Sequence, residues 1–135
     1  MEKQIMGIEG FFGKVIHTYT RKQAIEDGVL VDVSMMAREA GFKVPVAVTH
    51  AVWCDYVEPT EELRNIGQSE QGRLWDIMWM LFLKARHCSG DTVRFALSVR
   101  FGTEEEDVQR VVLKAVIGPG DEGEPVITIM LPHED

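Results

Sequence analysis

Residues 69–87 form the most apolar stretch of the chain, with seven consecutive apolar side chains from Ile77 to Leu83. Neither glycine nor proline occurs between Gly72 and Gly90, and Leu, Met and Ala are good helix formers. Ser69 is a suitable N-cap, and cations suit the negative end of a helix dipole. The last turn holds three basic residues, Lys84, Arg86 and His87. The stretch therefore predicts one helix of about four turns.

A helix that is apolar on nearly every side must be enclosed by other elements, so we expect this one to be the central core helix. Truncating Trp79 within it would then cost roughly 3 to 5 kcal/mol of folding free energy.

The segment 20–90 is predicted to be mainly helical. Thr20 and Gln23 match a capping box and predict a short helix, and Ser34 can cap a second helix over residues 35–40. Three further runs lie in the same segment, namely an extended run at 29–33, an alternating run at 42–48 and a helical pattern at 49–57. Pro45 makes the alternating run an edge strand or an extended lead-in.

Beyond Gly90 the apolar period changes to two. Residues 94–101 alternate cleanly, and 110–117 and 126–131 are β-rich, which predicts an antiparallel meander of three strands. The fold class expected is α+β, with a helical N-terminal part and one central apolar helix packed on a three-stranded antiparallel sheet. We expect a single domain, 1–135, divided into an N-terminal arm (1–19, with apolar residues between Gly7 and Val15), a helical part (20–90) and the meander (91–132).

The apolar run is shorter than the ~20 residues that span a bilayer, and the N-terminus lacks a basic region followed by a long apolar one, so we expect a cytoplasmic protein without a membrane partner.

The net charge is −8, and residues 102–135 carry nine acids against Arg110 and Lys114. An acidic surface repels phosphates and attracts basic protein patches, which argues against direct nucleic-acid binding and favours a protein partner with a basic surface. The acids assigned to that partner surface are Glu104, Glu105, Glu106, Asp107, Asp121, Glu122 and Glu124. Met35 and Met36, on a short exposed helix, are a second candidate partner surface.

Four side chains are of the types that bind zinc and are a candidate metal site, namely His50, Cys54, His87 and Cys88. Neither pair has the spacing of a zinc ribbon, and adjacent His87 and Cys88 would both have to face one ion. We expect free thiols and no metal or other cofactor. No nucleophile with a base and no phosphate loop is evident, so we assign no catalytic residue.

Asp76 lies one turn into the apolar helix. It is either a functional acid with a raised pKa or a structural group bonded to Arg73 or an indole. With Trp75 and Trp79 it defines the alternative function, a small-ligand-binding protein or enzyme with its site near the central helix.

Three segments, 12–33, 72–80 and 118–132, together resemble a family of small uncharacterised bacterial proteins, a domain of unknown function. The resemblance implies a setting on plasmids, phages and integrated elements, and it implies no activity. Small acidic proteins in that setting are often counter-defence factors. The function expected is therefore a non-enzymatic binding protein of a mobile genetic element, for instance an inhibitor of a host defence complex such as a CRISPR effector.

Overall fold

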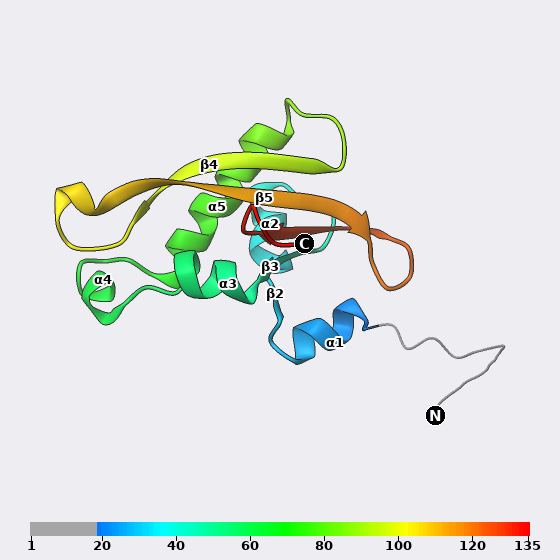
Figure 1. Cartoon of the computed structure of the whole chain (residues 1–135), viewed down its shortest axis with the longest axis horizontal. Helices are drawn as coiled ribbons and strands as arrows, with labels where there is room; N and C mark the ends of the chain where they lie inside the picture. Colours follow the sequence, from blue (N-terminus) through cyan, green and yellow to red (C-terminus); the bar gives the residue numbers. More distant parts are fainter. Residues whose placement is uncertain (1–18) are drawn as a thin grey trace.

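The computed structural model describes residues 19–135, and the arm expected between Gly7 and Val15 lies outside them. Figure 1 shows one curved sheet with short helices around it and one longer helix against it. In chain order the elements are α1 (Arg21–Glu26), β2 (Leu30–Asp32), α2 (Ser34–Ala40), β3 (Val46–Thr49), α3 (His50–Val52), the π-helical turn η1 (Trp53–Val57), α4 (Glu61–Asn65), α5 (Glu70–Ala85), β4 (Thr92–Arg100), the 3₁₀ turn η2 (Glu105–Asp107), β5 (Val108–Pro119) and β6 (Pro125–Met130).

The sheet has five strands in the order β2-β3-β6-β5-β4. Strands β4, β5 and β6 form the expected meander, but β3 lies parallel to β6 and β2 lies antiparallel to β3. The expected three-stranded antiparallel sheet is therefore wrong, and the sheet is mixed. The helical part supplies two of its strands. Pro45 precedes β3 instead of interrupting it, so its missing N–H removes no bond from that strand, and Val46 and Val48 can lie fully buried inside the sheet.

Helix α5 confirms the helix expected at 69–87 but not its central, enclosed position. Its contacts are with β4, α2 and η1, and the residues that it buries lie along one face, Arg73, Leu74, Ile77, Met78 and Leu81. Trp79 is 41% exposed, and Met80 and Leu83 are each 37% exposed. The expectation of one apolar helix wrapped on all sides is wrong, because the sheet and α2 cover only one side of α5.

Several local signals act as predicted. The capping box at Thr20 and Gln23 begins α1, and the Ser69 hydroxyl accepts the Gly72 N–H at 3.0 Å at the start of α5. Helix α2 ends at Gly41, whose φ of +117° favours glycine. Among the described residues no helix has the length and apolar content needed to cross a membrane.

Candidate functional site

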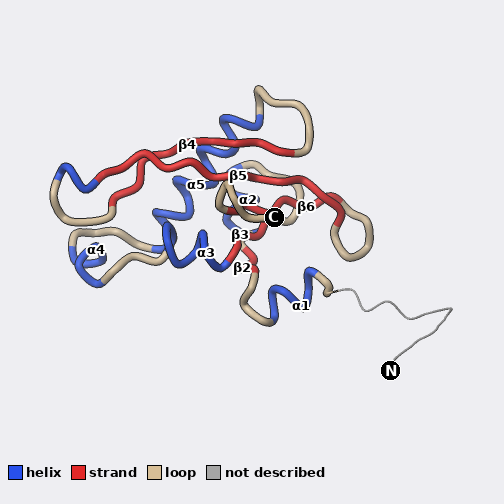
Figure 2. The backbone as a smooth tube through the Cα atoms, viewed as in Figure 1, coloured by secondary structure: helices blue, strands red, loops and turns tan. Residues whose placement is uncertain are grey.

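The seven acids that the sequence assigned to a partner surface are divided between the two ends of β5. Figure 2 shows η2 at one end of this strand and the β5–β6 turn at the other. Because a strand rises about 3.3 Å per residue, the two ends of β5 lie roughly 36 Å apart. Each group of acids therefore belongs to a different end of the molecule.

The acids of the β5–β6 turn take part in internal hydrogen bonds. The Asp121 carboxylate accepts the backbone N–H groups of Arg21, at 2.7 Å, and of Lys22, at 3.0 Å. These two bonds lower the pKa of Asp121. Glu124 accepts the N–H of Glu122 at 2.9 Å. Asp121 thus attaches α1 to the turn, and Glu122 alone of these three acids has a carboxylate without a hydrogen-bond partner among residues 19–135.

At the other end, Glu104 and Asp107 form a reciprocal capping box around η2, while Glu105 and Glu106 point to solvent. Residues 58–66, which include α4, supply further acids at this end of the molecule (Figure 1). Glu58, Glu61 and Glu62 are exposed and form no ion pair within the described chain. We call Glu61, Glu62, Glu105 and Glu106 the acidic end.

Arg73 holds the two segments of the acidic end together, and it is the one buried charged residue among residues 19–135. Its Nε donates to the Tyr56 carbonyl at 3.0 Å, and its Nη1 donates to Gln68 Oε1 at 3.1 Å and to the Arg100 carbonyl at 2.8 Å. Three points of the chain, just before α4, just after it and just before η2, are thereby fixed to α5. Burial lowers the pKa of Arg73, and the charge of Asp76 partly opposes this.

The role of Arg73 was not predicted, although the sequence contains a signal for it. Arg73 stands four residues before Ile77 and eight before Leu81, so it continues the buried stripe of the helix. A cation on such a stripe needs acceptors from the surrounding backbone.

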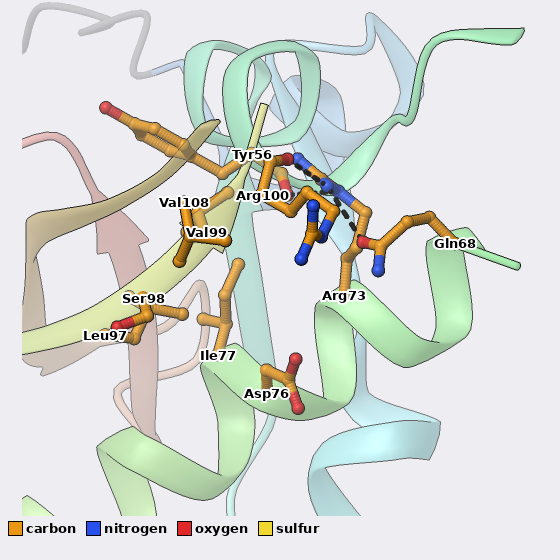
Figure 3. A pocket seen from close by; sticks show the side chains of 10 residues that line it. All are labelled: Tyr56, Gln68, Arg73, Asp76, Ile77, Leu97, Ser98, Val99, Arg100 and Val108. Atoms are coloured by element: carbon orange, nitrogen blue, oxygen red, sulfur yellow. Dashed lines mark hydrogen bonds between the residues drawn. The ribbon is translucent and has the colours of Figure 1, made fainter. Parts of the chain in front are cut away.

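Asp76 lines a cleft of about 200 Å³ between α5 and β4, together with Arg73, Ser98 and Arg100. Figure 3 shows its carboxylate set apart from the bonds of Arg73. No residue in the described chain donates a hydrogen bond to it. Burial raises the pKa of Asp76, and the charge of Arg73 partly opposes this.

Trp75 and Trp79 do not line this cleft. Their rings stack 6.1 Å apart, and Trp79 stacks on Phe82 at 5.9 Å, so the three aromatic rings run along another side of α5. The structure therefore separates Asp76 from the two tryptophans with which the sequence grouped it.

The two methionines of the second candidate partner surface differ in exposure. Met35 is 77% exposed, whereas Met36 is half-buried and packs against the core.

Cys54 Sγ lies 3.3 Å from His50 Nε2 across one helical turn, and both residues are exposed. His87 and Cys88 follow the end of α5, and no group of three or more metal-ligating side chains forms within the described chain. Cys54 and Cys88 are both free thiols.

Comparison with known proteins adds one finding. No curated protein and no solved structure matches the chain. A family model matches residues 8–135, which is nearly the whole sequence. The chain therefore belongs to a family of unknown function, DUF6573.

Proposed function

We propose that this protein acts by binding another protein and that its acidic end contacts a basic surface of the partner. The supporting observation is that glutamates from two segments far apart in the sequence lie exposed at one end, held by the buried bonds of Arg73. Preformed charge of one sign gives an interface its specificity and speeds association.

The proposed contact surface keeps two of the seven acids assigned from the sequence, Glu105 and Glu106, and adds Glu61 and Glu62 of α4. The carboxylates of Asp107 at this end, and of Asp121 and Glu124 at the other end of β5, accept internal hydrogen bonds. We assign the partner contact to four of the exposed acids at this end, Glu61, Glu62, Glu105 and Glu106. We further propose that the protein works in the cytoplasm, that it belongs to a mobile genetic element, and that its partner is a nucleic-acid-handling host defence complex such as a CRISPR effector. Basic channels in such complexes match an acidic end, which is the support for this choice.

The cleft at Asp76 supports the second candidate, a small-ligand site. The raised pKa of Asp76 favours it. The volume of the cleft, about 200 Å³, is below the roughly 300 to 1,000 Å³ of typical ligand pockets, and Trp75 and Trp79 do not line it. Protein binding therefore fits the geometry better.

The test compares two variants of equal charge. In the first, Glu61, Glu62, Glu105 and Glu106 are changed to Gln. In the control, four exposed acids outside the acidic end are neutralised, Glu26, Glu39, Glu122 and Asp135. Partner captured from the native host is identified by mass spectrometry, purified, and titrated against each variant at several salt concentrations.

We expect the first variant to bind at least about tenfold more weakly, while the control stays within about twofold of the unchanged protein. Affinity should also fall steeply with salt. Equal affinities for the two variants, or binding independent of salt, would refute the acidic end as the contact surface.

A further inference from the structure

One face of the β4–β5 pair carries a cluster of cations, although the net charge of the protein is −8. The odd-numbered residues of β4, for example Phe95, are buried on the side of α5, so the even-numbered residues point to the opposite face. On that opposite face Arg94 lies directly across from Lys114 of β5. Ser98 lies directly across from Arg110 in the same way. We call these four residues, Arg94, Ser98, Arg110 and Lys114, the basic face.

The cations of the basic face are available to a ligand. Arg94 and Arg110 are exposed, and neither forms an ion pair or a side-chain hydrogen bond within residues 19–135. Lys114 Nζ donates to the backbone carbonyl of Glu134 at 2.6 Å. That acceptor is a neutral group, so it does not cancel the charge of Lys114. No acid occurs among the residues of β4 and β5 that point to this face within the paired part of the two strands.

The placement of Arg94 opposite Lys114 is unfavourable for folding. Like charges directly opposite each other on neighbouring strands destabilise a sheet. An anion bound between the two groups would remove this repulsion, whereas a purely structural surface gains nothing from it. The pair therefore indicates a site for an anionic ligand.

The other residues on this face point to the class of anion. They are short, namely Thr92, Ala96, Val112 and Val116, so the longer cations stand above them. Protein partners usually dock on a packed centre with large apolar or aromatic anchors, and single-stranded nucleic acids stack their bases on aromatic side chains. Neither kind of residue is present on this face. Arginine, lysine and serine, by contrast, are residue types that contact phosphate oxygens.

We propose that the basic face binds the phosphate backbone of a double-stranded nucleic acid. Arg94 and Ser98 are four residues apart on β4, so the face is roughly 13 Å long. A DNA duplex carries about one charge per 1.7 Å of its axis, so any part of a duplex that lies on this face brings several phosphates within reach of the cations. Contacts with phosphates alone carry no sequence information, so binding is independent of sequence.

The acids near this face restrict how the duplex lies. The acidic end follows Arg100 at one end of β4, and the acids of the β5–β6 turn follow Val116 at the other end of the paired strands. Arg100 itself donates to the carbonyls of Gly102 and Glu104, so we leave it out of the basic face. A duplex that crosses the strands avoids both groups of acids, whereas one that follows the strands approaches them.

The expectation against nucleic-acid binding was drawn from the total charge and its excess in residues 102–135. The strand register places two cations from that acidic part of the chain, Arg110 and Lys114, on a face with Arg94. The basic face is therefore a local exception to the sign of the whole surface. It is also separate from the acidic end, so this inference does not rest on the proposed function.

The test titrates the full-length protein into a fluorescein-labelled DNA duplex of about 20 base pairs and follows fluorescence anisotropy at several salt concentrations. We expect a dissociation constant of roughly 10⁻⁴ to 10⁻⁶ M, as for other sequence-independent binding. The logarithm of the binding constant should fall against the logarithm of the salt concentration with a slope of about −2.7, which is about −0.9 for each of three phosphates.

Two variants of equal charge assign the binding to the basic face. Arg94→Gln combined with Arg110→Gln should weaken binding at least about tenfold and make the slope shallower by about 1.8. The control combines Arg38→Gln with Lys43→Gln, two exposed cations of α2 and the segment after it, and should bind within about twofold of the unchanged protein. Urea denaturation should give similar midpoints for all three proteins, because the changed side chains are exposed.

Two competitors distinguish the duplex from other anions. A single-stranded DNA of the same length and poly-glutamate are each added to the labelled complex, and we expect unlabelled duplex to displace the label at the lowest concentration of charge. Stronger competition by the single strand or by poly-glutamate would assign the face to unpaired bases or to an acidic protein and would overturn the proposal. Absence of duplex binding at about 50 mM salt, or equal affinities for the two variants, would overturn it as well.

Discussion

The two faces of α5 are similar in composition and opposite in environment. On the inner face, Ile77 is 1% and Met78 0% exposed, whereas on the outer face Trp79 is 41% exposed. Both faces consist largely of apolar residues, so the sequence contains no polar stripe that would mark the outer one. The composition of a helix thus indicates how much apolar surface it carries. It does not indicate how much of that surface is buried in the core of the protein.

Removing an inner side chain should give the largest effect. Met78→Ala leaves a cavity beneath α5 and should cost about 2 to 5 kcal/mol of unfolding free energy, measured by urea denaturation with an unchanged slope. A loss below about 1 kcal/mol would place Met78 outside the rigid core.

Arg73→Met tests the charged end of the same inner face. The change removes three hydrogen bonds and leaves the carbonyls of Tyr56 and Arg100 without their buried donor. We expect a loss of roughly 2 to 3 kcal/mol, the cost of leaving buried acceptors unsatisfied. Hydrogen exchange should show faster opening of the α4 and η2 segments, whereas Arg64→Met, which removes an exposed ion pair, should cost less than about 1 kcal/mol. Similar losses for the two variants would argue against Arg73 as the residue that joins these segments.

Trp79→Ala probes the outer face and corrects the expectation of 3 to 5 kcal/mol for an enclosed ring. Because Trp79 is 41% exposed, its main fixed contacts are the stacked rings of Trp75 and Phe82. Loss of this stacking should cost about 1 kcal/mol, measured by the same urea titration. A cost equal to that of Met78→Ala would contradict the difference between the two faces.

The smallest effect should come from Asp76→Asn, and its sign depends on pH. Because burial raises the pKa of Asp76 in the folded protein, the folded state binds this proton more tightly than the unfolded chain does. The contribution of this carboxyl to stability therefore falls as pH rises from the ordinary carboxyl pKa through the raised one. Asp76→Asn should stabilise the protein slightly at neutral pH, by less than about 0.5 kcal/mol, and the gain should vanish well below the ordinary pKa. Destabilisation at neutral pH would mean that the carboxylate has a favourable partner.

Local signals predicted the local structure well, since the cap at Ser69, the box at Thr20 and the alternation of β4 act between neighbouring residues. The mixed sheet was missed because its pairing joins distant segments. Val46 pairs with Ile127, and nothing within either segment specifies that partner. Pro45 also suggested an edge strand. A proline just before a strand, however, leaves the backbone hydrogen bonds of that strand intact.

The candidate site was predictable only in part. The separation of the acids by β5 follows from the strand pattern, and the exposure of Met35 agrees with its expected place on a short exposed helix. The contribution of α4 to the acidic end depends on Arg73, which reaches backbone carbonyls at residues 56 and 100. Such contacts leave no pattern in composition or spacing, because every residue carries a carbonyl.

The position of β6 also determines when folding can be completed. Strand β6 lies in the middle of the sheet, between β3 and β5, although it comes after all the other described strands in the chain. Until residues 125–130 have been synthesised, β2 with β3 and β4 with β5 can form only two separate antiparallel pairs. The edges of β3 and β5 that later bind β6 have no partner in that state. The sheet can therefore close only after β6 has been synthesised, through a pairing of residues about 80 positions apart, and contacts that distant in sequence are associated with slow folding.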